Sequence, residues 1–187
     1  MKMDYTKIKG YLTEKRRIHT EAVVETALKL CEVYGEDAEK AELAATFHDL
    51  YRGVKTDCIN YHVLHLGLEE KYKDNANLAH GKIAAYVMEH NYNIKDQDVL
   101  NAVSYHTTGR AGMSLLEKII YIADAIEPNR VYPGVEKIRD MAFKDIDRAC
   151  LMSMENTISF VNKTGNYLDI DTIEAKEWFD RVIKEKI

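Results

Sequence analysis

The stretch AATFHDLYRG, residues 44–53, places a histidine and an aspartate side by side at the end of an alanine-rich apolar run. Ala44 and Ala45 are typical of a helix that packs against a core. His48 and Asp49 are not, because a buried polar or ionisable side chain is costly unless it is paired or bound to a metal. Imidazole and carboxylate groups are ligands of divalent transition metals. The pair therefore raises the question of which other side chains could share a site with it.

Helical periodicity dominates the segments between the glycine and proline breakers. Apolar residues recur at steps of three and four, whereas period-two alternation with turn pairs is nearly absent. The fold class is therefore expected to be all-α, a compact multi-helix bundle of around eight to ten helices. We expect helices over residues 19–34, 39–50, 80–90, 99–106, 113–126, 146–161 and 172–187.

Composition narrows the class of protein. The net charge of −5 argues against general binding to nucleic acid or to an anionic membrane. No segment approaches the roughly 18 apolar residues of a transmembrane helix, and the N-terminal residues contain no apolar leader core. The three cysteines are far apart, which disfavours a disulfide framework or a thiolate zinc site. We expect a cytoplasmic protein with neither a nucleic-acid nor a membrane partner.

Further polar residues could complete a metal site with the histidine–aspartate pair. Five of the seven histidines lie near helix ends or breakers or on apolar faces, namely His19, His48, His80, His90 and His106. Asp124 interrupts the apolar segment YIADAIEP. If Asp49 bridges two metal ions, His19, His48 and Asp124 would complete the first site. His80 and His106 would complete the second. The predicted metal ligands are His19, His48, Asp49, His80, His106 and Asp124.

The remaining histidines are interpreted as structural or surface residues. His62 and His65 have an i,i+3 spacing that could hold a metal, but no acidic partner is obvious for them. His90 is likewise interpreted as a structural or surface residue.

Three motifs carry a resemblance to a known family. They are RRIHT at residues 16–20, FHD at 47–49 and YHTTGRAGMSLLEKIIYIADAIEPNRVYPGVEKIR at 105–139. The chain resembles the HD-domain metal-dependent phosphohydrolase superfamily, and within it the YqeK-type family of symmetrical diadenosine tetraphosphatases. The resemblance runs from about Tyr11 to Phe179. The block at 105–139 is its most specific part, because core packing does not require these residues.

The resemblance implies a metal-dependent hydrolase that cuts diadenosine tetraphosphate and related dinucleoside polyphosphates into two ADP. The nucleophile would be a metal-activated hydroxide, since a bound metal lowers the pKa of water toward about 7. The same six side chains would hold one or two ions, with iron as the first choice and manganese or zinc as alternatives. Asp49, His80 and His106 would be the catalytic residues, and the products would be ADP- or GDP-like nucleotides.

The resemblance also implies a set of substrate-binding residues. The segment DIDTIEA, residues 169–175, corresponds to the part of the family that closes over the nucleotide. Arg52 stands where members of the family often have a lysine. The planar guanidinium of Arg52 would replace the point charge of that lysine, which could change how the phosphates are held. Lys82 is interpreted as a solvated lysine rather than as an added phosphate contact. The residues predicted to bind substrate are Arg16, His19, Asp49, Arg52, His80, His106, Thr107, Asp124, Arg130, Asp171 and Thr172.

The predicted organisation is a single HD-type hydrolase domain over residues 1–187. Its core would span about 15–130, with C-terminal helices from 133–187 packed on it. Other readings remain open: another HD-superfamily nucleotidase or phosphodiesterase with the same ligands, or a nucleotide-binding regulatory module with a slow site. A purely structural helical protein would leave Asp124 unexplained. Base preference is not fixed by the sequence, and a homodimer is left open.

Overall fold

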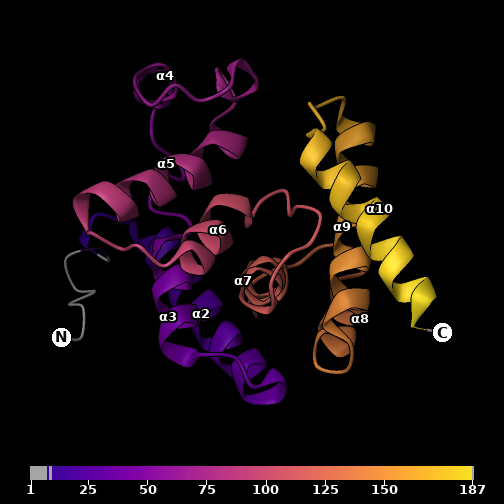
Figure 1. Cartoon of the computed structure of the whole chain (residues 1–187). Helices are drawn as coiled ribbons and strands as arrows, with labels where there is room; N and C mark the ends of the chain where they lie inside the picture. Colours follow the sequence, from indigo (N-terminus) through magenta and orange to yellow (C-terminus); the bar gives the residue numbers. More distant parts are fainter. Residues whose placement is uncertain (1–7, 9, 187) are drawn as a thin grey trace.

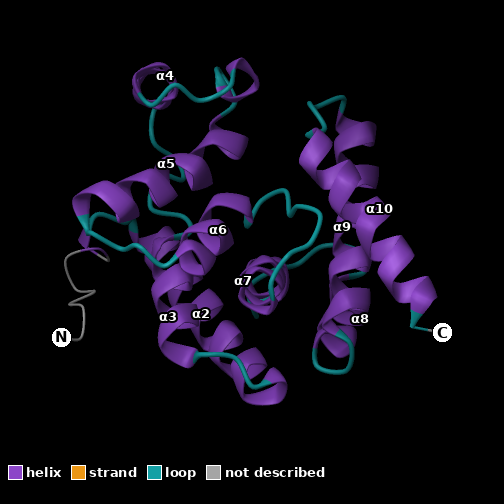
Figure 2. Cartoon of the chain, in the orientation of Figure 1, coloured by secondary structure: helices purple, strands orange, loops and turns teal. Residues whose placement is uncertain are grey.

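The computed structural model describes Ile8 and residues 10–186, and this part of the chain is built from helices joined by loops (Figures 1 and 2). No strand occurs within these residues, which confirms the all-α prediction. Their nine α-helices and one 3₁₀ helix are α2 (Glu14–Tyr34), α3 (Ala38–Phe47), α4 (Thr56–His65), η1 (Glu70–Tyr72), α5 (Ala76–Asn91), α6 (Gln97–Tyr105), α7 (Leu115–Ile126), α8 (Val135–Ala142), α9 (Ile146–Thr164) and α10 (Ile170–Glu185).

Helix α7 is the centre of the bundle, and Figure 1 shows it nearly end-on between the other helices. It packs against α2, α3, α6, α8 and α9. Its sequence is apolar on nearly every side, as expected for a helix that is surrounded by others. Ile119, Ile120 and Ile122 are fully buried. Ser114 begins the helix by accepting a hydrogen bond from the backbone N–H of Glu117.

The other helices form two groups around α7. Helices α2, α3, α5 and α6 pack on one another on one side, while α8 and α9 contact α7 from the other and α10 packs on α9 (Figure 1). A smaller apolar cluster under α4, η1 and α5 contains Ile59, Val63, Tyr72, Ala79 and Ile83. Within the described residues, no helix is both long enough and apolar enough to cross a membrane.

Each helix predicted from periodicity is present, with shifted ends. The helix predicted to start at His19 begins at Glu14, because Thr13 caps it. The helix predicted to continue to Leu50 ends at Phe47, so His48 and Asp49 lie in the turn that follows.

Helices α4 and α8 were not among the predicted segments. Tyr61 and Leu64 of helix α4 are apolar residues on its exposed side, so the sequence of α4 does not show one clear apolar face. Helix α8 starts directly after the helix breakers Pro133 and Gly134. The predicted division of the domain near residue 130 stays a prediction.

Gly81 lets α5 approach the end of α6. A Cβ built at this position would lie 2.8 Å from the carbonyl oxygen of Val103 and 3.1 Å from the His106 ring. Neither neighbour can move freely, because one is backbone and the other is a fully buried ring. The glycine is therefore a packing requirement of the α5–α6 contact.

Gly81→Ala is expected to destabilise the protein by about 1–3 kcal/mol, the usual cost of overpacking a core. Gly10→Ala is the matched control, because nothing lies within 4 Å of the Cβ position there. Urea unfolding followed by circular dichroism measures both changes. A Gly81→Ala protein as stable as the Gly10→Ala protein would contradict the packing argument.

Candidate metal centre

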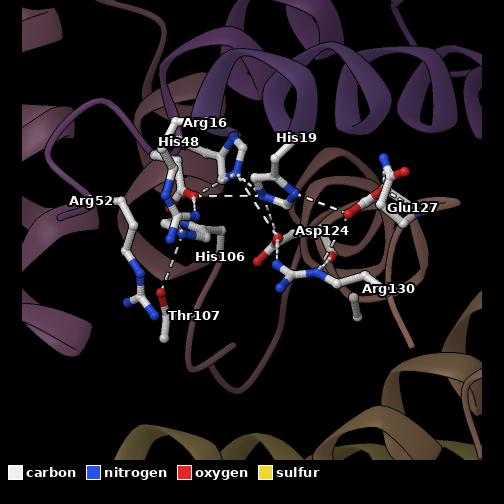
Figure 3. A network of polar contacts seen from close by, with 12 residues as sticks. Arg16, His19, His48, Arg52, His106, Thr107, Asp124, Glu127 and Arg130 are labelled. Atoms are coloured by element: carbon white, nitrogen blue, oxygen red, sulfur yellow. Dashed lines mark hydrogen bonds and ion pairs between the residues drawn. The ribbon is translucent and has the colours of Figure 1, made fainter. Parts of the chain in front are cut away.

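The six predicted metal ligands come from five segments of the fold and meet in one cluster. Helices α2, α5 and α7 carry His19, His80 and Asp124. His48 and Asp49 follow the last residue of α3, and His106 follows the last residue of α6. Figure 3 shows the cluster at the ends and inner faces of these helices. All six side chains lie within one network of contacts.

The two carboxylate oxygens of Asp49 face different imidazoles. Oδ1 lies 3.2 Å from Nε2 of His80 and 3.9 Å from Nε2 of His106. Oδ2 lies 3.5 Å from Nε2 of His19 and 3.8 Å from Nε2 of His48. Asp49 therefore occupies the place between two ligand groups that its predicted bridging role requires.

Asp124 extends the group that contains His19. Its Oδ1 lies 3.1 Å from Nε2 of His19 and 4.0 Å from Nε2 of His48. Its side chain is 21% exposed, because it faces a cavity. Donor atoms of His19, His48 and Asp124 lie within 4.8 Å of one another. Those of His48, Asp49 and His106 do as well.

Three histidines present the same nitrogen to the cluster for the same reason. Nδ1 of His48 donates to the carbonyl oxygen of Ala45 (2.6 Å), and Nδ1 of His106 donates to that of Val103 (2.7 Å). In His80, Nδ1 donates to the carbonyl oxygen of Ala76 at 3.1 Å. A carbonyl can only accept, so Nδ1 carries a proton in each ring, and Nε2 is the nitrogen that can offer a lone pair to a metal. His19 differs, because its Nδ1 contacts the carboxylate of Glu127.

Both carboxylates are held in the charged form. Burial raises the pKa of Asp49, but His48 and a hydrogen bond from His80 lower it more, so the net pKa lies well below the usual range. Burial likewise raises the pKa of Asp124, but the hydrogen bond with His19 and the charges of Arg130 and His48 together outweigh burial, so this pKa is also lowered. Ionised carboxylates are the form that binds a cation.

Their surroundings shift the pKa values of His106 and His19 in opposite directions. Burial lowers the pKa of His106 to about 3, so this imidazole is neutral at neutral pH. Burial also lowers the pKa of His19, but the hydrogen bond and charge of Asp124, together with the hydrogen bond of Glu127, outweigh burial, and the net pKa is raised. Nε2 of His80 and Nε2 of His106 lie only 3.0 Å apart. Converging imidazole nitrogens beside two ionised carboxylates form a donor set that fits a divalent transition metal.

Two arginines are ion-paired with the carboxylates of the cluster. Nη1 of Arg16 lies 2.6 Å from Oδ2 of Asp49. Arg130 donates to the side chain of Asp124, and its Nε also donates to the carbonyl oxygen of Asp124 at 2.8 Å. Both arginines thus orient predicted ligands as well as adding positive charge.

Arg52 and Thr107 lie beside the cluster on its other flank (Figure 3). Within the described part of the chain, no carboxylate forms an ion pair with Arg52, whose Nη1 reaches only the carbonyl oxygen of Asn77 at 3.5 Å. The hydroxyl of Thr107 lies 3.2 Å from Nε2 of His106. The free guanidinium charge is therefore available to an anion.

A cavity of about 1120 Å³ adjoins the cluster. Arg52, His106, Asp124 and Arg130 line its inner end. One wall is formed by η1 and the start of α5, and the opposite wall by α9 and the loop before α10. The sequence analysis did not identify these walls, whose residues include Lys71, Lys73, Tyr132, Asn156, Phe160 and Tyr167.

The two C-terminal residues predicted to bind substrate occupy different places. Thr172 is buried and lines the cavity. Asp171 is not among the lining residues, and its Oδ2 lies 3.8 Å from Nζ of Lys71. Lys71 also lies 3.2 Å from Oδ1 of Asp169, so η1 and the start of α10 are joined across the cavity.

The histidines interpreted as structural lie outside the cluster. His65 stacks on Tyr61 and His90 stacks on Tyr86, in both cases with ring centroids 3.8 Å apart. His62 packs edge-on against Tyr51.

The prediction of a solvated Lys82 is wrong. Its Nζ lies 3.2 Å from the centroid of the Tyr105 ring, and burial lowers its pKa to about 8. The ammonium group therefore lies over the ring of the residue just before His106 instead of in solvent.

Comparison with known proteins places this arrangement in a family. A family model described as HD domain matches residues 16–129. The symmetrical bis(5'-nucleosyl)-tetraphosphatase of Bacillus subtilis (strain 168) is 40% identical over 172 residues, which cover 91% of this chain and 92% of the relative. The protein of the same name from Halalkalibacterium halodurans is 44% identical over 167 residues and covers 89% of each chain.

A solved structure matches the whole architecture. The predicted HD superfamily hydrolase involved in NAD metabolism from Clostridium acetobutylicum aligns with a TM-score of 0.90 and 41% identity. The alignment covers 97% of this chain and 99% of that chain. The chain belongs to the HD domain family, among the symmetrical bis(5'-nucleosyl)-tetraphosphatases.

Proposed function

We propose that the protein hydrolyses diadenosine tetraphosphate, and related dinucleoside polyphosphates, symmetrically into two nucleoside diphosphates. The bond between the central bridging oxygen and one of the two middle phosphorus atoms breaks. The oxygen of water bonds to that phosphorus, and the bridging oxygen leaves with the second ADP. The observation that carries the proposal is the position of Asp49 between two imidazole groups, beside a cavity lined by Arg52 and Arg130. The names of the relatives support the substrate.

An HD domain implies a divalent metal, and the buried imidazole and carboxylate donors fit one. We propose His19, His48, Asp49 and Asp124 as ligands of a first ion, and His80 and His106 with Asp49 as ligands of a second. Iron is our first choice from the family resemblance, with manganese or zinc as alternatives. When bound, such a metal supplies Lewis-acid stabilisation of a phosphoryl oxygen and lowers the pKa of a coordinated water.

The chain's own residues would manage the charge of the polyphosphate. Arg52 has no carboxylate partner among the described residues, so its charge is available to a phosphate oxygen. Thr107 adds a hydroxyl next to it. Arg16 and Arg130 hold Asp49 and Asp124 in place and bring further positive charge to the same end of the cavity.

The proposed catalytic residues are Asp49, His80 and His106. Their side chains are nearly fully buried, so bulk water is excluded on this side of the reacting phosphorus. Oδ1 of Asp49 is the nearest carboxylate oxygen to Nε2 of His80, at 3.2 Å. Their role would be to hold the metal centre at which water is activated, with Asp49 shared by both ligand groups.

The cavity extends from this end along two walls, which suits a substrate with two nucleosides. Lys71 and Lys73 line the wall at η1, and Tyr132 and Phe160 line the opposite side. Aromatic faces stack on bases, and lysines attract phosphates. Thr172 lines the same cavity, whereas Asp171 would act through Lys71.

We also propose a cytoplasmic location and no role for nucleic acid or membranes, in keeping with the acidic chain. A homodimer stays an open prediction.

Incubation with diadenosine tetraphosphate and a ferrous or manganous salt is expected to yield ADP as the sole early nucleotide product. Ion-exchange chromatography separates ADP from AMP and ATP. Early AMP plus ATP would contradict symmetrical cleavage. Rapid hydrolysis of a mononucleotide or cyclic dinucleotide, with diadenosine tetraphosphate left intact, would favour another HD nucleotidase or phosphodiesterase.

Asp49→Ala is expected to reduce activity to background and to remove most bound metal, because both ligand groups lose their shared carboxylate. Helicity measured by circular dichroism should change little. His62→Ala is the control, since its ring packs on Tyr51 outside the cluster. Metal analysis of the purified variants measures the effect. Equal metal content in both variants would overturn the ligand assignment.

Arg52→Ala is expected to lower kcat/KM by about 10- to 100-fold, the usual effect of losing one charged hydrogen bond, with the metal content unchanged. Arg52→Lys should recover part of this loss, because the charge is kept and the planar fork is not. Arg17→Ala is the matched control, because Arg17 pairs with Glu14 and Glu21 on the surface. A kcat/KM for Arg52→Ala equal to that of Arg17→Ala would remove Arg52 from the phosphate site.

A further inference from the structure

Glu127 is a buried carboxylate that the predicted ligand set does not contain. It directly follows the last residue of α7 and is 2% exposed. Its Oε1 lies 3.1 Å from Nδ1 of His19, on the side of the ring that faces away from Asp49 (Figure 3). Its Oε2 accepts from the backbone N–H of Asn129 at 2.6 Å and from the Asn129 side chain at 3.0 Å. Both carboxylate oxygens are therefore used, and the group is rigidly placed.

Two carboxylates at the C-terminal end of α7 thus contact the two ring nitrogens of His19. Asp124 lies 3.1 Å from Nε2 of His19, and Glu127, three residues later, lies 3.1 Å from Nδ1. A carboxylate at Nδ1 holds the proton on that nitrogen, so Nε2, which faces Asp124 and Asp49, is the nitrogen that can coordinate a metal.

The other three cluster histidines are held in a different way. His48, His80 and His106 each donate from Nδ1 to a backbone carbonyl three or four residues earlier. These acceptors belong to the main chain of their own segments, so no side-chain substitution removes them. His19 depends instead on a side chain 108 positions away. Its orientation is therefore set by the packing of α7 against α2.

We propose that Glu127 is a positioning residue of the metal centre, which fixes the tautomer and orientation of His19 and strengthens its Nε2 as a ligand. This inference rests on the proposed role of His19 as a ligand. A carboxylate that accepts from a ligating imidazole makes the imidazole more basic, and loss of such a partner typically weakens metal affinity by about 10- to 100-fold. The effect is confined to the His19 group, because the other three histidines keep their carbonyl partners.

Manganese binding to the full-length, metal-free protein tests the proposal. Free Mn²⁺ is measured by its electron paramagnetic resonance signal during titration. Glu127→Gln keeps the shape of the side chain and removes its charge, and Glu127→Ala removes the acceptor. We expect about 10- to 100-fold weaker binding for Glu127→Ala and a smaller loss for Glu127→Gln.

Glu117→Gln is the matched control. Glu117 is also a buried glutamate of α7, 1% exposed, but it pairs with Arg110 at 2.6 Å away from the cluster. Its substitution should leave Mn²⁺ affinity unchanged. Affinity in Glu127→Gln and Glu127→Ala equal to that in Glu117→Gln would overturn the proposal.

A second readout separates positioning from support of the turn after α7. In the zinc-loaded protein with ¹⁵N-labelled histidine, the Nδ1–H signal of His19 should be shifted downfield by the carboxylate and protected from exchange. Glu127→Ala should remove this signature, while the signals of His48, His80 and His106 stay unchanged as internal controls. Asn129→Ala removes the side-chain hydrogen bond to Glu127 and keeps the backbone one and Glu127 itself, so it should retain the His19 signal. Equal metal loss in Asn129→Ala and Glu127→Ala, with the His19 signal unchanged, would assign Glu127 to the turn alone.

His19→Ala distinguishes failure of this inference from failure of the metal assignment. Unchanged Mn²⁺ affinity in His19→Ala would mean that His19 is not a ligand, and the proposed centre itself would fail. Weakened binding in His19→Ala with normal binding in both Glu127 variants would overturn only the positioning role.

Discussion

The contact on which the rest of the structure depends is the one between Asp49 and the four imidazoles around it. Each carboxylate oxygen faces two rings, at distances from 3.2 to 3.9 Å. The rings come from α2, from α5 and from the ends of α3 and α6, so these four helices must meet at one point. Helix α7 supplies the apolar surface against which α2, α3 and α6 pack, and it ends next to the same point. An unpaired carboxylate would be costly there, which ties the packing of the core to the chemistry of the site.

The distribution of charge explains how an acidic chain suits an anionic substrate. The net charge is −5, yet Arg52 and Arg130 line the inner end of the cavity and Lys71 and Lys73 line a wall. Association depends on the field inside a cleft more than on the total charge. Arg130 is paired with Asp124, whereas Arg52 has no carboxylate partner within the described residues. Arg130 thus orients a predicted ligand, whereas Arg52 is the arginine that we propose contacts the phosphates.

Much of the candidate site was visible in the sequence because its residues break local rules. His48, Asp49 and Asp124 interrupt apolar segments, and such interruptions are a signal for pairing or metal binding. Glu127 gave no such signal, because a glutamate after a helix and before a proline is ordinary in sequence. Its role comes from a contact with His19, 108 positions away, that only the packing of α7 on α2 creates. Lys82 was misread for a related reason, since the Tyr105 ring that covers it lies on the next helix.

The sequence by itself determined the helical class, most of the helices and the identity of the six clustered side chains, because periodicity and residue chemistry are local properties. Helices α4 and α8 were not predicted, since both are short and α8 starts directly after Pro133 and Gly134. Only the tertiary structure decided that Asp49 stands between two imidazole groups, that Arg52 keeps a free charge and that η1 and α9 form opposite walls of one cavity. The physical reason is that these properties are distances between segments, and such distances are set by how the helices pack around α7.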